Sequence, residues 1–562
     1  MKRLLALLLA SVMALAVFAG CTADTNVDDQ PDGTQTEAPS NEEPTTTPSG
    51  DEGDAQEGSL CTVSEDSDIV VLNYADISTF FPANITQSTE YLLASFAYES
   101  LCDFNDDMSI KYVLATGSEV SEDGLEYTFT LREGVYFSDG APWNAEACKA
   151  NFDLILDESN AFMGVWMLTG AIESCEVVDE YTIKLHLYAP YAPLLNVIAA
   201  YNGFVSPNLI EKGEEAWKNE VVGTGQYTLA SYTSGESAVY ELNRNYWGYN
   251  AEIAGENAIA SDAGFNSITV RPVAEESTRI AMVLSGEADI INSVTATNIP
   301  NIEAGGATVI QQPGSTIGYL YFNCQKGALT DARVRKAIAM AIDVDSLINV
   351  VYGGANQPCD SVLVPSITSY KSMGRIEYDV EAAKALLAEA GYSDGLTLVA
   401  WEENDTTDIQ RGEFIQQQLE QIGITLEIYP MESGILATRV GAFDGDPAEQ
   451  EYDLYIRGYG TDTYDPDEML GRYSTAAFTP AGSNYSFYSN PEYDALIEQG
   501  ASATDQAERD EIYAQAQEIL WEEMPVFPLH VNTWIAAHGS RIENLTYTSV
   551  GDFNFNGARF VG

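Results

Sequence analysis

The sequence predicts an α/β protein of two or more domains, and three observations support this. The chain has 562 residues, of which 45% are hydrophobic, which is enough to fill more than one core. Short apolar runs typical of buried strands alternate with stretches of helical spacing. No internal repeat of 20–50 residues is visible, which argues against a solenoid or a propeller.

Residues 1–21 are predicted to be a targeting segment. Lys2 and Arg3 precede an apolar stretch over residues 4–18, which is shorter than the ~20 residues that a membrane span requires. Small residues then precede Cys21, as in a bacterial lipoprotein signal, in which this cysteine is lipidated after cleavage. We therefore expect Cys21 to be the lipidation site, and the alternative is an ordinary secretory signal.

Residues 22–58 are expected to form a disordered acidic tether. This segment contains no Lys or Arg and is rich in Thr, Pro, Gly, Asp and Glu. Such a composition cannot bury a core. The folded part is predicted to begin near residue 59.

The first half of the folded part alternates strands and helices. Pro142 and Asn144 are typical of a helix start, and Cys148 falls on the apolar face of that helix. Gly223 and Gly225 precede strand-forming residues rather than a helix, so we interpret them as a turn and not as a phosphate loop. Strands are expected over residues 69–74, 182–187, 265–273 and 288–291, two short strands over 125–137, and further helices over 91–101 and 275–286.

The second half shows the same alternation. Glycines follow several of the expected helices, as is typical of helix ends. Strands are predicted over residues 317–323, 396–401, 425–429 and 526–531, and helices over 331–342, 343–353, 380–390, 413–422 and 507–524.

The charge and the cysteines exclude several classes of partner. The formal net charge is −61, with only 25 Lys and Arg, so the surface repels nucleic acid and anionic lipid headgroups. Six cysteines remain after Cys21, and their wide spacing does not fit a zinc site. Their disulfide pairing stays open, because six cysteines allow 15 pairings.

No catalytic motif is present. The sequence lacks G-x-S-x-G, H-E-x-x-H and a Walker-type phosphate loop, and it has three histidines. Residues 103–114 open like a calcium loop, but Met108 and Leu114 stand where that loop requires Gly and Glu. We therefore predict no enzyme activity, no metal and no cofactor. An exported hydrolase is the remote alternative.

Residues 452–470 carry the most informative local pattern. The sequence begins as a strand and breaks at Gly458 and Gly460 into a turn-rich loop. Ligands of open α/β sheets bind beyond the carboxyl ends of strands. Asp462, between Tyr459 and Tyr464, is therefore a candidate pocket residue for an amino-bearing ligand, and the alternative is a solvated acidic loop.

Six segments together resemble the peptide/nickel-type (family 5) extracellular solute-binding proteins of bacterial ABC transporters. In the order of that family they are LEYTFTLREGVYFSDGAPWNAEACKANF (125–152), VGTGQYTLASY with NRNYWG (222–232 and 243–248), TRIAMVLSGEADII (278–291), GYLYFNCQKGALTDARVRKAIAMAID (318–343), YDVEAAKALLAEAGY (378–392) and FYSNPEYDALI (487–497).

The resemblance implies a two-lobe, hinge-connected fold of the periplasmic-binding-protein type, in the type II large cluster. Lobe one is expected over residues 59–316, with an extra subdomain at about 96–220, and again over 530–562. Lobe two is expected over 317–529. The crossings between the lobes are expected near residues 316–323 and 526–532.

The resemblance also implies a function. We expect a lipid-anchored protein that captures oligopeptides or dipeptides and delivers them to the permease subunits of an ABC importer. It is expected to be a monomer that contacts the membrane only through its lipid anchor, on the outer face of the bacterial cytoplasmic membrane or in the periplasm. A nickel or metal-chelate binder of the same family is the alternative.

In relatives that bind dipeptides, an aspartate at the position of Asp462 pairs with the amino terminus of the ligand. Those relatives also carry an Arg for the ligand carboxylate in the loop after the strand that matches residues 396–401. No Arg occurs in residues 401–410 here, which favours longer peptides or a cationic ligand. The candidate substrate-binding residues are Asp462, Tyr459, Tyr464, Tyr321, Asn323, Trp401 and Trp166.

Overall fold

A computed structural model describes residues 60–201, 203–548 and 551–561. The predicted targeting segment with Cys21 and the predicted tether lie outside the described residues. Among the helices within these ranges, none combines the length and the apolar character needed to cross a membrane.

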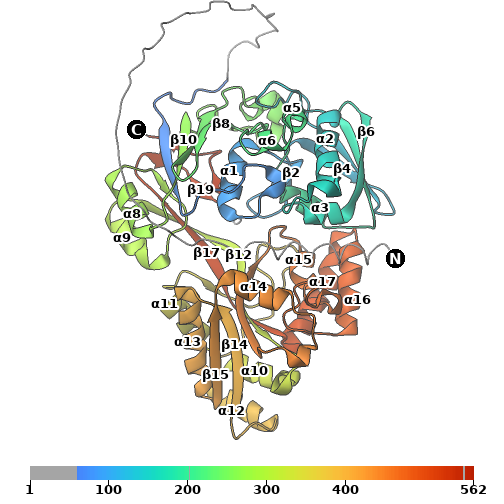
Figure 1. Ribbon diagram of the computed structural model, residues 1–562, viewed down its shortest axis with the longest axis vertical. Coiled ribbons are helices and arrows are strands. Elements are labelled where there is room, and N and C mark those ends of the chain that lie inside the picture. Colours follow the sequence, from blue (N-terminus) through green and yellow to red (C-terminus); the bar gives the residue numbers. More distant parts are fainter. Residues whose placement is uncertain (1–59, 202, 549–550, 562) are drawn as a thin grey trace, which may run out of the picture. The chain divides into compact units, whose positions relative to one another are not determined.

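One mixed sheet of 11 strands runs through the unit Gly58–Gly562, in the order β15-β14-β16-β12-β17-β11-β1-β10-β9-β8, with β13 paired to β17. Its two longest strands, β12 (Thr308–Phe322) and β17 (Val526–His538), pair over most of their length and run from one lobe into the other (Figure 1). One end of this strand pair lies beside lobe-one strands and the other beside lobe-two strands.

Lobe one contains one end of this sheet and a second sheet of four strands, ordered β4-β5-β7-β6. Both contribute to one hydrophobic core. The strands are β1 (Asp68–Asn73), β2 (Cys102–Phe104), β3 (Ile110–Tyr112), β4 (Ala115–Val120), β5 (Glu126–Leu131), β6 (Ile172–Asp179), β7 (Thr182–Leu187), β8 (Tyr227–Thr233), β9 (Ser237–Leu242), β10 (Ser267–Pro272) and β11 (Ile290–Ile291). The helices are α1 (Ser88–Ala97), α2 (Ala145–Leu156), α3 (Trp166–Ala171), α4 (Leu194–Ala199), α5 (Pro207–Lys212), α6 (Glu214–Trp217), α7 (Ala251–Ala254), α8 (Glu276–Ser285) and α9 (Ile299–Ala304).

The end of the chain packs against the lobe-one core. It forms the short strands β18 (Ile542–Glu543), β19 (Thr546–Tyr547), β20 (Phe553–Asn554) and β21 (Arg559–Phe560). Tyr547, Phe553 and Phe555 are buried in the same cluster as the residues of β1 and α1.

Lobe two is a three-layer α/β unit. Along β12 the residues alternate between its faces: Leu320 and Phe322 belong to the core under α10–α13, and Tyr321 to the core under α14–α17. The strands are β13 (Gln357–Pro358), β14 (Leu396–Glu403), β15 (Ile424–Met431) and β16 (Leu454–Gly460). The helices are α10 (Ala332–Met340), α11 (Val344–Val351), α12 (Val380–Glu389), α13 (Thr406–Glu420), α14 (Ser433–Gly441), α15 (Pro466–Gly471), α16 (Pro491–Ser502) and α17 (Gln506–Glu523).

Each helix from α10 to α17 begins at a residue whose side chain accepts a hydrogen bond from a backbone N–H of the first turn. Most of these caps are aspartates, such as Asp405 before α13 and Asp465 before α15. Capping satisfies donors that the helix leaves unpaired. Part of the acidity of the chain therefore has a structural role.

A bulge interrupts β12 where it passes between the lobes. Pro313 pairs with Thr533 and Ile317 with Val531, so three residues of β12 face one residue, Asn532, of β17. The side chain of Asn532 accepts a hydrogen bond from the backbone N–H of Thr316, at 2.9 Å. The bulge turns Ser315 toward the space between the lobes, where it lines the cavity described below.

The structure differs from the sequence expectations in several elements. The second strand expected within 125–137 is absent from this part of the described chain, where Tyr136 forms only an isolated bridge with Pro142. The helix expected over 91–101 is α1, which lies several residues earlier. The strands expected over 317–323 and 526–531 are the longer β12 and β17.

The predicted acidic loop over residues 401–410 was also wrong. β14 continues to Glu403 and α13 already begins at Thr406, because Asp405 caps the helix with two backbone hydrogen bonds. The helix expected over 413–422 therefore begins seven residues earlier than predicted.

The turn at Gly223 and Gly225 is confirmed, since β8 follows it and no helix does. Its physical reason is close packing. A Cβ atom on Gly223 would lie 2.0 Å from the carbonyl oxygen of Ala97, at the end of α1. Only glycine allows the chain to pass there.

Candidate functional site

A cavity of about 790 Å³ lies between the lobes. Lobe one forms most of its wall, through the segment from α1 to β3, the residues around Tyr246 and Trp247, and the C-terminal strands β19 and β20. Lobe two contributes Thr461 and Asp462, which follow β16, and the bulge of β12 contributes Ser315. The volume falls in the range of small-molecule sites.

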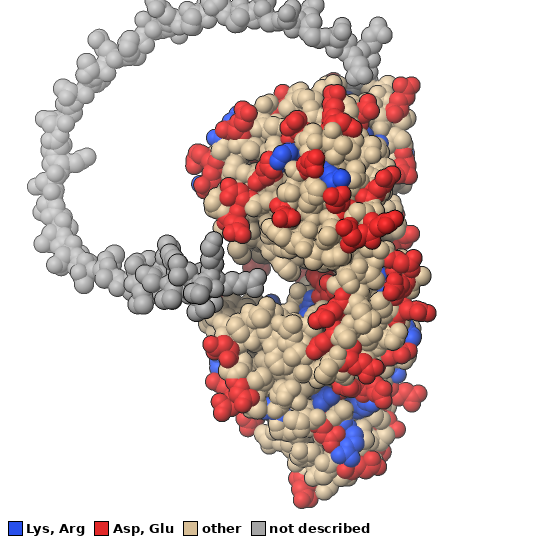
Figure 2. All heavy atoms as spheres, turned by 90° about the vertical axis from the view of Figure 1, so that its right-hand side faces the viewer, with Lys and Arg blue, Asp and Glu red and all other residues tan. Residues whose placement is uncertain are grey.

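The lining of this cavity is strongly acidic. Among the described residues it contains one basic side chain, Lys111, and no Arg. Lys111 lies 3.7 Å from Asp103, so part of its charge is already balanced. The carboxylates are Glu99, Asp103, Asp106, Glu256, Asp462 and Asp552. Acidic side chains also dominate the outer surface, where basic ones are sparse (Figure 2).

Glu99 is held by three neutral donors. Its carboxylate accepts hydrogen bonds from the Thr224 hydroxyl (2.7 Å), the Tyr246 hydroxyl (2.7 Å) and the Trp247 indole N–H (2.8 Å). Burial raises the pKa of Glu99, and these three bonds oppose that increase. The glycines at 223 and 225 bring Thr224 to this position. The arrangement fixes a carboxylate at the cavity without a cation bonded to it.

Glu468 organises the loop that carries Asp462. Its Oε2 atom accepts hydrogen bonds from the Thr461 hydroxyl (2.7 Å), the Thr463 hydroxyl (2.7 Å), the Thr463 N–H (3.0 Å) and the Asp462 N–H (3.2 Å). Thr461 and Thr463 are both buried. Four bonds to one carboxylate oxygen fix the backbone on both sides of Asp462.

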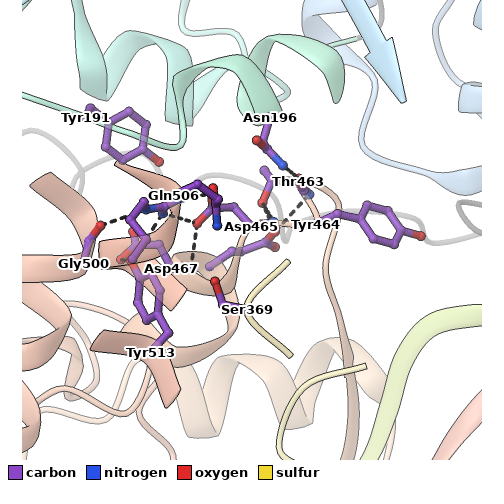
Figure 3. A network of polar contacts seen from close by, with 12 residues as sticks. Tyr191, Asn196, Ser369, Thr463, Tyr464, Asp465, Asp467, Gly500, Gln506 and Tyr513 are labelled. Carbon is purple, nitrogen blue, oxygen red and sulfur yellow. Dashed lines mark hydrogen bonds and ion pairs between the residues drawn. The ribbon is translucent and has the colours of Figure 1, made fainter. Parts of the chain in front are cut away.

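A buried ion pair anchors the end of this loop. Asp465 caps α15 and receives two hydrogen bonds from the guanidinium of Arg509, at 2.8 and 2.9 Å. Arg509 also donates to the carbonyl of Gly500. Asp465 and Gly500 lie within the polar network of Figure 3, from which the ring of Tyr464 points away. In the same view Asn196 of α4 reaches Thr463 from lobe one, donating to its carbonyl at 2.8 Å.

The carboxylate of Asp462 is open to the cavity. It has no hydrogen-bond partner within the described residues, although its backbone N–H is bound by Glu468. The residue is exposed to solvent, yet the protein atoms that surround the cavity replace part of the water around its carboxylate. This desolvation, with the nearby charge of Glu468, raises the pKa of Asp462 to about 6, and Arg472 partly opposes the increase.

Asp552 is a second carboxylate of this kind. It precedes β20, and its backbone carbonyl accepts a hydrogen bond from the Thr548 N–H at 2.8 Å. No described side chain or N–H donates to its carboxylate. Desolvation, followed by the charge of Asp103, raises the pKa of Asp552 to about 7.

Of the seven candidate substrate-binding residues, Asp462 lines the cavity, and the other six do not. Tyr464 is fully buried and packs edge-on against Phe104 of lobe one, with 5.4 Å between ring centroids. Tyr459 lies under the guanidinium of Arg472. Both flank the loop without facing the cavity.

The remaining candidates lie further away. Tyr321 and Trp401 are buried in the core under α14–α17, because their strands place them on that face. Asn323 is fully buried and donates to the carbonyl of Pro447. Trp166 begins α3, where 67% of the residue is exposed.

The sequence analysis missed Glu99, Glu468 and Asp552. The glutamate three residues after Asp465, early in α15, was a usable signal for Glu468, since a carboxylate in the first turn of a helix bonds nearby backbone N–H groups. Glu99 and Asp552 had no local signal. They reach the cavity through contacts between segments that are far apart in the chain.

A further group of carboxylates, Glu403, Asp405 and Asp408, lies at the end of β14 and the start of α13. Each is already engaged: Glu403 faces Arg457 at 3.4 Å, Asp405 caps α13, and Asp408 pairs with the buried Arg411. Two arginines beside three acids do not favour a metal ion.

The cysteines form no disulfide in the described residues. Cys61, Cys102, Cys148, Cys175 and Cys359 are buried as thiols, and Cys324 is half-buried. The predicted core position of Cys148 is confirmed, since it is fully buried on α2.

Comparisons with a family model and with curated proteins both match most of this chain. The family model described as "Bacterial extracellular solute-binding proteins, family 5 Middle" matches residues 109–479. The glutathione-binding protein GsiB of Salmonella typhi is 31% identical over 500 residues, which cover 87% of this chain and 94% of that protein.

Solved structures agree with this. DppA from Helicobacter pylori is a periplasmic binding protein associated with an ABC transporter, and its structure was solved with the peptide STSA. Its sequence is 28% identical to this chain. The two structures superpose with a TM-score of 0.70, and the match covers 88% of this chain and 98% of DppA. HbpA2 from Haemophilus parasuis superposes with a TM-score of 0.78 at 24% identity, covering 88% and 99%. The second likeness supports the fold alone.

Proposed function

Since the chain belongs to the bacterial extracellular solute-binding proteins of family 5, we propose that it captures peptides and delivers them to the permease of an ABC importer. Members of this family bind and hand over solutes and do not convert them. The two-lobe α/β fold predicted from the sequence is confirmed by the family and its structural neighbours. The identity of the ligand, the lipid anchor and the roles of the site residues are proposals.

The observation that carries the peptide proposal is the position of Asp462. A loop held by Glu468 presents the Asp462 carboxylate, which has no partner in the part of the chain that the structure describes, to a cavity between two lobes. A carboxylate of this kind suits the ammonium of a peptide amino terminus, because a charge-assisted hydrogen bond forms when the lobes close over the ligand. DppA, a relative with 28% identity, was solved with a peptide.

Two other ligands of the family fit the cavity less well. The relative GsiB is named for glutathione, a tripeptide with two carboxylates and one amino group. An anionic metal chelate, the alternative inferred from the sequence, carries negative charge as well. Both would face six carboxylates and one lysine without any arginine, which disfavours them.

We further propose that the mature protein is a monomer held by a lipid on Cys21, on the outer face of the cytoplasmic membrane or in the periplasm. The argument is the sequence of the first 21 residues followed by an acidic, Pro- and Thr-rich segment. The lobe boundaries expected from the sequence are part of this proposal, with the bulge of β12 as one of the two crossings.

Native mass spectrometry tests the proposal. The full-length protein is expressed in a bacterium and purified from membranes without denaturation, and its bound species are then released by acid. We expect a set of short peptides, a monomeric mass, and a chain that begins at a lipid-modified Cys21. A single metal-containing species would contradict the peptide proposal, and release of glutathione alone would contradict the charge argument against anionic peptides. A chain cleaved elsewhere without lipid would contradict the anchor.

A further inference from the structure

The cavity presents two carboxylates that accept no hydrogen bond from the residues the structure describes. Asp462 projects from the loop after β16 in lobe two, and Asp552 from the turn before β20 in lobe one. Both also lie near Tyr464. Burial is the main cause of the raised pKa of Tyr464, and the negative charges of Asp462 and Asp552 add to it, which they can do only from close by. The two acids therefore lie on different lobes at the same cavity.

The protein supplies little positive charge to balance them. Lys111 faces Asp103. Arg472, the nearest cation to Asp462, donates to the carbonyls of Glu468 and Met469 and lies over the ring of Tyr459. Glu99 is bonded only to neutral donors. Cationic groups of a ligand would favour the ionised form of both acids and supply the positive charge that the lining lacks.

The cavity also contains an unused polar group. Tyr98 lines it and is 4% exposed, and its hydroxyl makes no hydrogen bond of normal geometry within the described residues, although the backbone of Val222 lies close enough to oppose the rise of its pKa. A buried hydroxyl without a partner is rare in native structures. A ligand that offers more than one N–H donor would satisfy it.

We propose that the ligand carries two cationic groups, with its amino terminus at Asp462 and a second ammonium or guanidinium at Asp552. The solute class is then a short basic peptide with Lys or Arg near its amino terminus. This inference rests on the proposed peptide function. Closure brings the two carboxylates onto one ligand, so the second cation adds to affinity and to specificity.

Isothermal titration with matched peptides tests the proposal on the full-length protein. The probes are Lys-Ala-Ala, Ala-Lys-Ala and Ala-Ala-Lys, each paired with a peptide in which norleucine replaces lysine and removes only the charged group. We expect the best lysine peptide to bind at least about tenfold more tightly than its norleucine partner. Equal affinity in all three pairs would overturn the proposal without any variant.

Two substitutions assign the two charges. Asp552→Asn should abolish the preference for lysine, so that the lysine peptide and its norleucine partner bind equally. Asp462→Asn should weaken both peptides, because it removes the partner of the amino terminus. Asp66→Asn and Asp394→Asn change the same charge at exposed positions outside the cavity and should alter neither. A lysine preference that persists in a folded Asp552→Asn protein would overturn the inference.

The diamine cadaverine separates this inference from the peptide function. If cadaverine binds and Asp552→Asn weakens it while no peptide binds, the two-carboxylate site is supported and the peptide proposal fails. If peptides bind without preference for lysine, the peptide proposal stands and the two-carboxylate site fails. Absence of binding by every probe would overturn both.

Discussion

At the scale of single residues, Asp462 shows how much a sequence pattern can predict. The two glycines at 458 and 460 predicted a loop with a carboxylate at a pocket. β16 runs through both of them to Gly460, so the expected break was wrong, but Asp462 in the loop that follows does line the cavity. The aromatic candidates were less predictable. Tyr321 and Trp401 lie on strands, and the alternation of side chains along those strands places both in a core. Helices cover both faces of this sheet, and the sequence does not show which face lies nearer to a ligand.

Glu468 is the residue for which we make the first prediction. Glu468→Gln keeps an oxygen acceptor but removes the charge that strengthens four hydrogen bonds to the loop. We expect binding of the lysine peptide at pH 8 to weaken by about 1–2 kcal/mol, or about five- to thirtyfold in Kd. Isothermal titration measures this, and Glu511→Gln, exposed on α17, is the matched control.

The pH profile distinguishes positioning from a loss of stability. The charge of Glu468 contributes to the raised pKa of Asp462. In Glu468→Gln that pKa should fall, so the decline in affinity on acidification should begin at a lower pH than in the wild type. A variant with weaker binding and an unshifted profile would show that Glu468 does not act on Asp462.

At the scale of elements, the helices of lobe two that were predicted had caps and apolar periodicity, which are local signals, whereas α14, α15 and α16 were not predicted. Asp343, for example, marked the start of α11 in the sequence. The errors arose where tertiary contacts determine the length of a strand or whether it forms. β12 and β17 extend beyond their apolar segments because each satisfies the backbone of the other. The expected strand at residues 135–137 had no such partner strand.

The bulge of β12 carries the second prediction. A Cβ on Gly314 would lie 2.3 Å from the Oδ1 atom of Asn532, the atom that accepts the hydrogen bond from Thr316. Gly314→Ala should therefore displace Asn532 and cost about 1–3 kcal/mol of unfolding free energy. Chemical denaturation measures this cost.

A double-mutant cycle identifies the cause. In the Asn532→Ala background the clash and the hydrogen bond are both absent, so the additional cost of Gly314→Ala should be small. Equal costs in the two backgrounds would contradict the proposed contact. Gly117→Ala is the matched control, because a Cβ at Gly117 would meet no atom within 4 Å.

At the scale of the whole molecule, the set of residues that line the cavity could not be predicted from the local sequence. Glu99 and Asp552 are separated by several hundred residues in the chain, yet both line one cavity. The resemblance to a family supplied the two-lobe fold and the residue Asp462. It did not supply the second carboxylate, Asp552.

The third prediction concerns the pH dependence of the ligand-free protein. Burial is the largest cause of the raised pKa of several carboxyl groups: about 6 for Asp462 and Asp467, about 7 for Asp408 and Asp552, and about 8 for Glu402. In an unfolded chain Asp and Glu titrate near pH 4. Between about pH 5 and 8 the folded state therefore binds more protons than the unfolded state, and stability must fall as pH rises through this window.

Thermal unfolding at constant ionic strength should thus give a higher Tm at pH 5 than at pH 8. Added NaCl should raise the Tm at pH 8, since the net charge of −61 destabilises the compact state by self-repulsion. A basic peptide should flatten the pH dependence, because a bound cation at Asp462 and at Asp552 favours the ionised form and lowers the pKa of each acid. The double variant Asp462→Asn/Asp552→Asn should show a similarly flattened profile without any ligand. A Tm that rises from pH 5 to pH 8 in the ligand-free wild type would contradict this account, since Asp462 and Asp552 would then have no raised pKa for a cationic ligand to lower.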